Sequence, residues 1–291
     1  MITKLENDLI EISVKEDGAE QVSFKLKEDG TEYLWQANPA VWGRYAPVLF
    51  PIVGRVKDNQ YTIDGKTYML GQHGFARDSK FVILTQTENS VEYQIISNKE
   101  TMKIYPFQFK LNVKYEIKDR TLKVAYTVEN IDDKKIYFSV GAHPGFKCPI
   151  VEGENIEDYY LEFSEKETAE VLRLNEESLV SSNKALFLKN ENIIPLSEKL
   201  FADGVLIFED LKSEKISIKS KKTNKSITME FQDFKYFGIW TVPDQPQFVC
   251  LEPWHGIADF DTSDGNLKTK EGIKILEQGE KFQCFYSITI R

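Results

Sequence analysis

Apolar and polar residues alternate along much of this chain, and this period of two limits its fold more than any other sequence feature. In the segment 109–117 every odd position is apolar, and a second alternating segment, 122–128, follows the short polar turn Asp119-Arg120. Successive side chains of a β-strand point to opposite faces, so each segment predicts a strand with one buried and one solvated face. Together the two segments predict an antiparallel hairpin.

Similar segments recur along the whole chain. We predict further strands at Leu9–Val14, Thr31–Trp35, Tyr61–Ile63, Tyr68–Leu70, Phe81–Thr85, Val91–Ile96, Ile136–Val140, Tyr159–Phe163, Ile216–Ser220, Ile227–Phe231 and Phe282–Ile290. Asp64-Gly65, between two of these, is a strong hairpin signal. Long helical patterns are missing, and Glu165–Leu174 is the best candidate for a short helix. Many strands without βαβ alternation favour an all-β fold, a large antiparallel sandwich or barrel with few short helices.

Length, charge and cysteine content narrow the class of protein. The 291 residues contain no Pro/Gly/Ser-rich linker and no fixed repeat, so we expect one domain, residues 1–291. A net charge of −9 argues against nucleic acid and anionic membranes as partners, because both recruit basic surfaces. No apolar run approaches the ~20 residues of a membrane span. Cys148, Cys250 and Cys284 are far apart and odd in number, so we expect reduced thiols in a cytoplasmic protein.

The three histidines all lie beside glycine or proline, where a strand ends and the backbone becomes irregular. His73 lies in the segment 71–77, His143 in the segment 139–146, and His255 directly after the segment 251–254. Loops anchored on a rigid sheet are where binding and catalytic sites are usually built. Each histidine is therefore a candidate, and a buried histidine bonded to a carbonyl is the alternative for His143. We expect His255 to be a rim residue.

Glu252 ends a continuous apolar run, Phe248–Leu251, which is typical of a strand covered on both faces. A carboxylate there is costly to desolvate unless it is paired or functional. Trp254 offers a flat apolar face beside it, and an acid next to an indole is a frequent sugar-binding combination. A structural pair between this glutamate and an arginine is the alternative.

Arginine is rare in this chain and lysine is common, so an arginine in a loop is a candidate for binding. Arg55 follows a proline-punctuated apolar segment, 46–54, and Arg44 and Arg77 have similar loop settings. Arginine is the better choice where a fixed fork of donors must be presented. Structural ion pairs are the alternative for Arg44 and Arg77.

Several classes of site are disfavoured by the motifs. The sequence contains no nucleophile elbow, phosphate-binding loop, dinucleotide-binding glycine motif, HExxH or acidic metal box, which argues against serine-hydrolase, nucleotide and metal chemistry. The histidines and Glu252 could hold a metal as in a cupin barrel, but their separations are long and no His-x-His pair exists. We therefore expect no metal.

Four separated segments, 42–51, 72–77, 141–146 and 251–254, resemble the aldose 1-epimerase (galactose mutarotase-like) family, and in particular its LacX-type branch. The similarity runs from the opening strands at 11–24 to the closing segment 279–290. It implies a large antiparallel β-super-sandwich with the site in a cleft on one concave sheet. It also implies a cofactor-independent mutarotase that interconverts the α and β anomers of a hexose by opening and reclosing its ring.

The same resemblance implies roles for individual residues. Glu252 matches the family's base, which takes the proton from the anomeric hydroxyl, and His143 matches the acid, which protonates the ring oxygen. His73 matches a second histidine that hydrogen-bonds the sugar. An acid–base pair of this kind predicts a bell-shaped pH profile. The predicted catalytic residues are thus Glu252 and His143.

The expected sugar-binding set is larger. Arg55 matches an arginine that holds hydroxyl groups, and Asp203 resembles, on a weaker local match, an aspartate that binds distal hydroxyls. We expect substrate contacts from His73, Arg55, Asp203, Trp254 and Arg77.

Three functions remain open at this point. The segment around His73 also occurs in the hexose-6-phosphate 1-epimerase branch, whose arginines hold phosphate, and Arg44 or Arg77 would take that role here. A non-catalytic carbohydrate-binding protein is the third reading, against which the presence of both Glu252 and His143 argues. The motifs fix neither the particular sugar nor the oligomeric state, monomer or homodimer.

Overall fold

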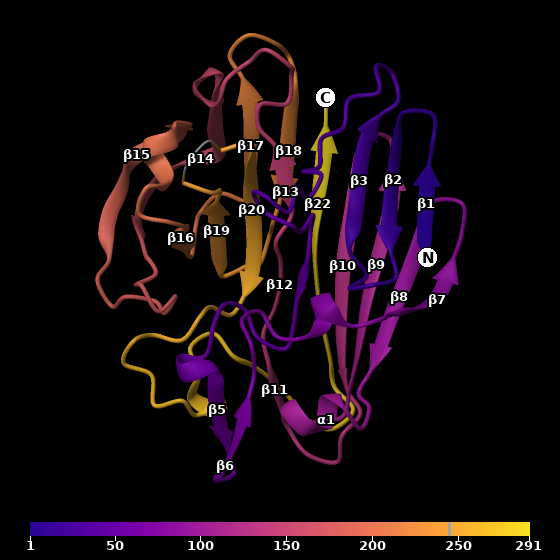
Figure 1. The fold of residues 1–291 in the computed structure, drawn as a ribbon, viewed down its shortest axis with the longest axis vertical. Helices are drawn as coiled ribbons and strands as arrows, with labels where there is room; N and C mark the ends of the chain where they lie inside the picture. Colours follow the sequence, from indigo (N-terminus) through magenta and orange to yellow (C-terminus); the bar gives the residue numbers. More distant parts are fainter. Residues whose placement is uncertain (244–245) are drawn as a thin grey trace.

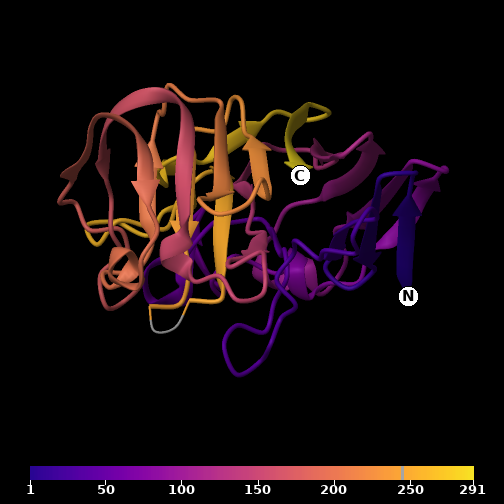
Figure 2. The same cartoon turned by 90° about the horizontal axis from the view of Figure 1, so that it is seen from above.

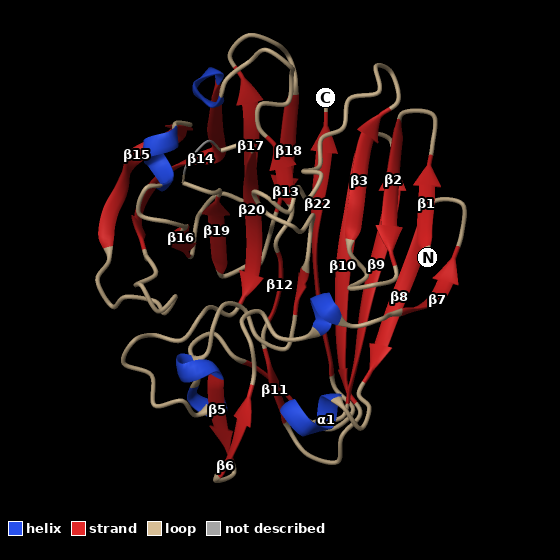
Figure 3. Cartoon of the chain, viewed as in Figure 1, coloured by secondary structure: helices blue, strands red, loops and turns tan. Residues whose placement is uncertain are grey.

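β-strands make up most of the regular structure in the computed structural model, which describes residues 1–243 and 246–291 (Figures 1 and 3). Within these residues, all pairings between the named strands are antiparallel. The described helices are short: Thr101–Ile104 (α1), Lys57–Asn59 (η1), Ala76–Asp78 (η2), Ile156–Asp158 (η3), Glu198–Phe201 (η4) and Leu267–Thr269 (η5). No helix among the described residues is long and apolar enough to cross a membrane. The predicted all-β class is confirmed.

The largest sheet has nine strands in the order β15-β14-β17-β18-β22-β10-β9-β8-β7. Their bounds are Val82–Gln86 (β7), Ser90–Ile96 (β8), Phe109–Lys118 (β9), Thr121–Asn130 (β10), Tyr159–Val171 (β14), Ala185–Pro195 (β15), Lys215–Ser220 (β17), Ser226–Glu230 (β18) and Lys281–Ile290 (β22). Burial alternates along β9 and β10, the predicted hairpin, so this part of the sheet buries one face. β22 lies between β10 and β18 and joins the two halves of the sheet (Figure 1).

A second sheet has the strand order β16-β19-β20-β12-β4, with β13 also paired to β20. Its strands are Val48–Leu49 (β4), Val140–Ala142 (β12), Gly145–Lys147 (β13), Leu206–Glu209 (β16), Tyr236–Trp240 (β19) and Phe248–His255 (β20). Every residue of β20 is buried, as its apolar run predicts. The second sheet packs on the large one through aromatic pairs: Phe208 on Phe163 and Phe237 on Phe231, with ring centroids 5.8 and 4.2 Å apart.

Three smaller groups of strands complete the fold. Ile2–Glu6 (β1), Ile10–Lys15 (β2) and Gln21–Leu26 (β3) form a sheet that lies beside β8–β10, on the side of the molecule away from β15 (Figures 1 and 2). The Tyr115 hydroxyl of β9 donates to the Ala19 carbonyl, 2.6 Å away, and ties the two sheets together. Two two-stranded sheets remain: the hairpin of Gln60–Ile63 (β5) with Lys66–Met69 (β6), and Ile136–Phe138 (β11) paired with the distant strand Lys274–Leu276 (β21).

The predicted turn at Asp64-Gly65 is confirmed. Both residues have positive φ, 49° and 74°, as a two-residue hairpin turn between β5 and β6 requires.

One continuous apolar cluster extends from Leu5 in β1 to Ile290 in β22. It receives side chains from the nine-stranded sheet, the second sheet and β1–β3. The sheets therefore share a single core, and the second sheet, which carries the motif residues, rests on it.

Two predictions of secondary structure are wrong, and a third is correct only in part. Glu165–Leu174 is not a helix: most of it continues β14, where the buried Glu167 carboxylate accepts from the Ser213 backbone N–H at 2.7 Å. Thr31–Trp35 is extended but forms only isolated bridges, because the Glu32 carboxylate binds the Phe24 N–H in place of a regular ladder. The predicted strand 136–140 is interrupted at Ser139, whose N–H donates to the Pro51 carbonyl.

Candidate active site

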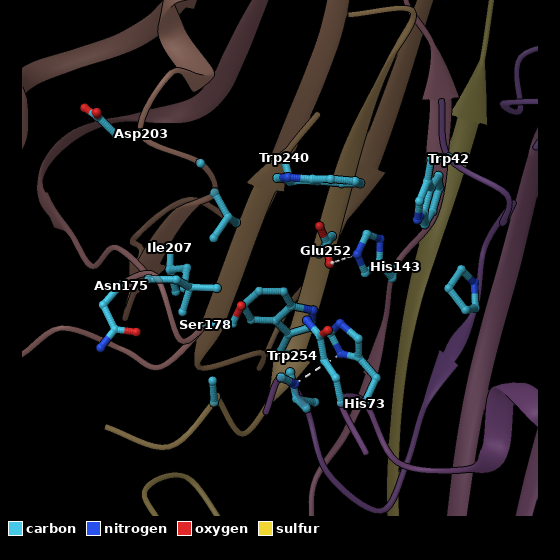
Figure 4. A pocket seen from close by; sticks show the side chains of 18 of the residues that line it. Trp42, His73, His143, Asn175, Ser178, Asp203, Ile207, Trp240, Glu252 and Trp254 are labelled. Carbon is cyan, nitrogen blue, oxygen red and sulfur yellow. Dashed lines mark hydrogen bonds and ion pairs between the residues drawn. The ribbon is translucent and has the colours of Figure 1, made fainter. Parts of the chain in front are cut away.

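Glu252 and His143 face each other on the second sheet (Figure 4). Glu252 lies in β20, and His143 lies in the short link between β12 and β13, both of which pair with β20. This pairing brings the imidazole over the strand, so that its Nε2 atom lies 3.2 Å from the Glu252 Oε2 atom. Glu252 is 1% exposed. Residues 109 positions apart in the sequence thus form one buried pair of ionisable groups.

Three indole rings surround this pair. Trp42 stacks on the His143 ring, with centroids 5.0 Å apart and an interplanar angle of 26°, and Trp240 meets the same ring edge-on at 5.6 Å. The Trp254 Nε1–H donates to the Ala142 carbonyl, 3.2 Å away, which fixes the third ring. These rings line a pocket of about 630 Å³ that contains the pair (Figure 4). Flat apolar walls around a few polar groups suit a small polar ligand with apolar faces.

His73 enters the same pocket from a strained turn. It has a φ of 65°, and Gly74 follows with a φ of 69°; a Cβ atom on Gly74 would lie 2.3 Å from the Phe50 carbonyl oxygen. The Gly54 backbone N–H donates to the His73 Nδ1 atom at 3.1 Å. Nδ1 is therefore an acceptor, and the hydrogen of the neutral ring is on Nε2. His73 can offer one N–H donor to a ligand beside His143, whose ring centroid is 5.6 Å away.

Burial controls the protonation of these groups. Desolvation raises the pKa of Glu252 well above its usual value and lowers the pKa of His143 to about 3. Burial, with the nearby charges of His143 and Arg77, also holds the pKa of His73 well below its usual range. A glutamate that acts as base and a histidine that acts as acid would ordinarily be ionised and protonated, respectively. The structure instead favours the neutral forms, a protonated glutamic acid beside a neutral imidazole.

Arg77 lines the pocket, and Arg55 does not belong to its lining. Arg77 donates through Nη2 to the Gln72 carbonyl at 2.7 Å, while its buried Nε atom has no hydrogen-bond partner. The Arg55 guanidinium lies 3.3 Å from the carbonyl oxygen of Glu177. Arg44 forms an ion pair with Asp78 at 2.7 Å. Of the three loop arginines, Arg77 is the one that the structure places beside the histidines.

The remaining predicted residues fall at different ends of the site. Trp254 and Asp203 both line the pocket. Asp203 is exposed and lies at the far end from Trp42 and the Glu252–His143 pair (Figure 4).

The prediction for His255 is wrong. It is 4% exposed, lies outside the pocket lining, and stacks on Phe234 with ring centroids 4.5 Å apart. Consecutive positions of a strand alternate between faces, so His255 points away from the face that carries Glu252 and Trp254.

Sequence reasoning also missed several residues of the pocket. Trp240 ends the apolar strand β19, and a tryptophan at a strand end was the available signal. Trp42 lay within a motif but was given no role. The loop residues Asn175 and Ser178 carried no signal, because only the tertiary fold brings their loop to the pocket.

A comparison with protein families identifies the group of proteins in which this site occurs. The family model described as "Aldose 1-epimerase" matches residues 1–271. The chain belongs to the aldose 1-epimerase family. This confirms the resemblance seen in the four sequence segments, and it makes the chain an isomerase of the epimerase type.

Relatives of this epimerase support the branch as well. It is 34% identical to the chromosomal protein LacX of Lactococcus lactis subsp. lactis over 298 residues, covering 100% of this chain and 99% of LacX. A galactose mutarotase related enzyme from Lactobacillus acidophilus is 40% identical, with a TM-score of 0.96 over 100% of this chain and 97% of the other. A galactose mutarotase-like protein from Lactobacillus casei is 30% identical, with a TM-score of 0.93 over 100% of both chains.

Proposed function

We propose that this aldose 1-epimerase interconverts the α and β anomers of a hexose with Glu252 as base and His143 as acid. The observation that carries the proposal is the 3.2 Å contact between Glu252 Oε2 and His143 Nε2 at the centre of the pocket. The anomeric and ring oxygens of a pyranose are bonded to the same carbon. An acid and a base held this close can therefore reach both oxygens of one bound sugar.

The Glu252–His143 pair can supply and accept all the protons that the reaction transfers. In the ion-pair form, the Glu252 carboxylate takes the proton of the anomeric hydroxyl while the His143 imidazolium protonates the ring oxygen. The bond between C1 and the ring oxygen breaks and leaves an open aldehyde, a protonated glutamic acid and a neutral imidazole. Rotation about C1–C2 exposes the other face, and the reverse transfers close the ring. Because one proton serves the whole cycle, we propose that no cofactor is needed.

The electrostatics of the pair fit this cycle. Burial raises the pKa of Glu252 and lowers that of His143, and both shifts favour the neutral forms present with the open aldehyde. The anomeric hydroxyl supplies a hydrogen bond that favours the ionised carboxylate when the cyclic sugar is bound. His73 stays neutral and acts as a hydrogen-bond donor, which suits a residue that polarises the ring oxygen.

We assign the remaining contacts to sugar hydroxyls. Trp254 and Trp240 present flat faces to the ring, and Arg77 presents donors next to His73. Asp203 is assigned to the hydroxyls farthest from C1, in keeping with its place at the far end of the pocket (Figure 4). Arg55 is assigned an indirect role through the loop that contains Glu177, which its guanidinium contacts. One chain supplies all of these groups, so we propose that a monomer is sufficient for activity.

A neutral hexose is favoured over a hexose 6-phosphate. Among the described residues that line the pocket, Arg77 is the one cationic side chain, whereas Glu176 and Asp203 are acidic groups outside the Glu252–His143 pair. Arg44, the other arginine considered for phosphate, is already paired with Asp78. A phosphate dianion would therefore face more negative than positive groups.

The test is the rate of anomer exchange for α-D-glucose, α-D-galactose and glucose 6-phosphate, measured by saturation-transfer NMR. Wild type should accelerate at least one neutral sugar, and Glu252→Gln and His143→Asn should each lower the rate by roughly 10²–10⁴-fold. His255→Asn is the matched control, because this histidine is buried outside the pocket. Unchanged rates in a folded Glu252→Gln variant would contradict the assignment. Preference for glucose 6-phosphate, lost at high salt, would favour the phosphosugar epimerase, and tight sugar binding without exchange would favour a binding protein.

A further inference from the structure

Cys250 lies two residues before Glu252 in β20, so both side chains point to the same face of the strand. It is fully buried and does not line the sugar pocket, and the proton transfers proposed above do not use it. Its Sγ atom nevertheless belongs to a compact group. Among the described residues, His143, Cys250 and Glu252 each offer one ligand atom, and these atoms all lie within 4.8 Å of one another.

One ligand atom of this group, the buried Glu252 Oε2, has no hydrogen-bond partner. It lies 3.2 Å from His143 Nε2 and points toward the imidazole ring (Figure 4). Buried polar atoms without partners carry a desolvation cost that a bound ligand can offset.

The donor set of imidazole nitrogen, thiolate sulfur and carboxylate oxygen matches one kind of ion. Zn²⁺ accepts all three donors at about 2.0–2.3 Å in tetrahedral geometry, and sites with three protein ligands keep the fourth position open. Mg²⁺ and Ca²⁺ prefer oxygen donors in larger number, so they do not fit this group.

We propose that His143, Cys250 and Glu252 form an inhibitory zinc site whose open position faces the sugar pocket. Binding exchanges one Zn²⁺ ion for the thiol proton of Cys250 and the carboxyl proton of Glu252, and both protons pass to the solvent. The bound ion occupies the lone pairs that the proton transfers need. The inhibitory part of the inference rests on the proposed function, whereas zinc binding itself rests on the geometry alone.

The binding test uses protein freed of metal by a chelator and then titrated with ZnCl₂ in a calorimeter. A parallel titration with CoCl₂ is followed by absorption, because a thiolate ligand gives Co²⁺ an intense near-ultraviolet charge-transfer band. We expect one Zn²⁺ per chain and a cobalt–thiolate band in the wild type. Cys250→Ser should abolish the band and weaken zinc binding roughly 10–100-fold or more. Cys284→Ser, at a buried cysteine of β22, should change neither quantity.

The activity test compares the same proteins on the sugar that wild type turns over best. Zinc should inhibit wild type and Cys284→Ser, whereas MgCl₂ should inhibit neither protein. Cys250→Ser should keep the rate of the metal-free wild type and should require roughly 10–100-fold more zinc for half-inhibition. Cys250→Ala replaces the serine variant if the hydroxyl group lowers its stability. Equal zinc binding in wild type and both Cys250 variants, or bound zinc that leaves the rate unchanged or raises it, would overturn the inference. A protein that is inactive on all sugars would contradict the proposed function. The cobalt spectra would still test whether the zinc site exists.

Discussion

Individual side chains in this protein owe their chemistry to burial more than to their type. Glu252 and His143 lie in contact, and desolvation shifts the pKa of the acid upward and that of the imidazole down to about 3. A second proton on the pair would create a buried imidazolium beside a neutral acid, and loss of the carboxyl proton would leave a buried carboxylate. Both are costly, so the pair holds one proton over a wide pH range, and its titration belongs to the pair as a whole.

The pH profile of anomer exchange should reflect this burial. Because the pKa of His143 is lowered to about 3, the acid limb of kcat/KM should lie well below the ~6.5 of an unperturbed histidine. Because the pKa of Glu252 is raised, the alkaline limb should lie well above the ~4.3 of an unperturbed glutamic acid. The predicted bell shape is therefore broad. Rates from pH 3 to 10, corrected for uncatalysed exchange, test this, and an acid limb centred at pH ~6.5 or above would contradict it.

At the scale of elements, the strands beside β20 are built to receive its large side chains. Gly238 of β19 pairs with Glu252, and Gly141 of β12 pairs with Trp254. A Cβ atom on Gly238 would lie 2.6 Å from the Trp254 ring and 3.3 Å from the Glu252 Cβ, and one on Gly141 would lie 2.7 Å from the same ring. The indole therefore lies across the sheet between two glycines, which hold it flat beside the acid–base pair.

Gly238→Ala should disturb the site without altering any catalytic group. The added methyl group overlaps the Trp254 ring, so the ring must move, at a cost of about 1–3 kcal/mol in the free energy of unfolding. We expect kcat/KM to fall on the order of ten- to a hundredfold through misplacement of the sugar. Urea denaturation and exchange rates measure the two effects. Gly71→Ala is the control, since nothing lies within 4 Å of its added Cβ, and equal activity in both variants would refute the packing argument.

At the scale of the whole molecule, the last strand holds the fold together. β22 pairs with β10 along nearly its full length and with β18 near its end, so the two halves of the nine-stranded sheet meet only after residues 281–290 are in place. The core cluster likewise runs without interruption from β1 to β22. On this basis we propose that residues 1–291 form a single domain.

A single domain predicts one cooperative unfolding transition. Since the sheets share a core, neither half buries its apolar face without the other, and differential scanning calorimetry should show one peak whose van't Hoff and calorimetric enthalpies agree. Removal of residues 281–291 should abolish that peak altogether. Two resolved transitions, or a folded truncated chain, would contradict the single-domain proposal.

Much of the fold could be predicted from the sequence. The alternation at 109–117 and 122–128 specifies local strands with one buried face, and the observed hairpin of β9 and β10 follows from it. Prediction failed where a polar side chain replaces a regular backbone pattern. Glu167 is buried within a strand because a partner 46 residues away binds its carboxylate, and Glu32 takes the place of ladder hydrogen bonds. A local sequence pattern does not indicate such partners from other parts of the chain.

The candidate site, like the fold, could be predicted from the sequence only in part. The sequence by itself identified Glu252 and His143 as candidates, because a carboxylate after an apolar run and a histidine between glycines are unusual locally. The family followed from the resemblance of four separated segments to known proteins. The tertiary structure alone decided that their atoms lie 3.2 Å apart, that Trp42 and Trp240 enclose the imidazole, and that His255 is buried outside the pocket. The physical reason is that contact and burial depend on which distant strands pair, and desolvation, which sets the proton chemistry, exists only once they have paired.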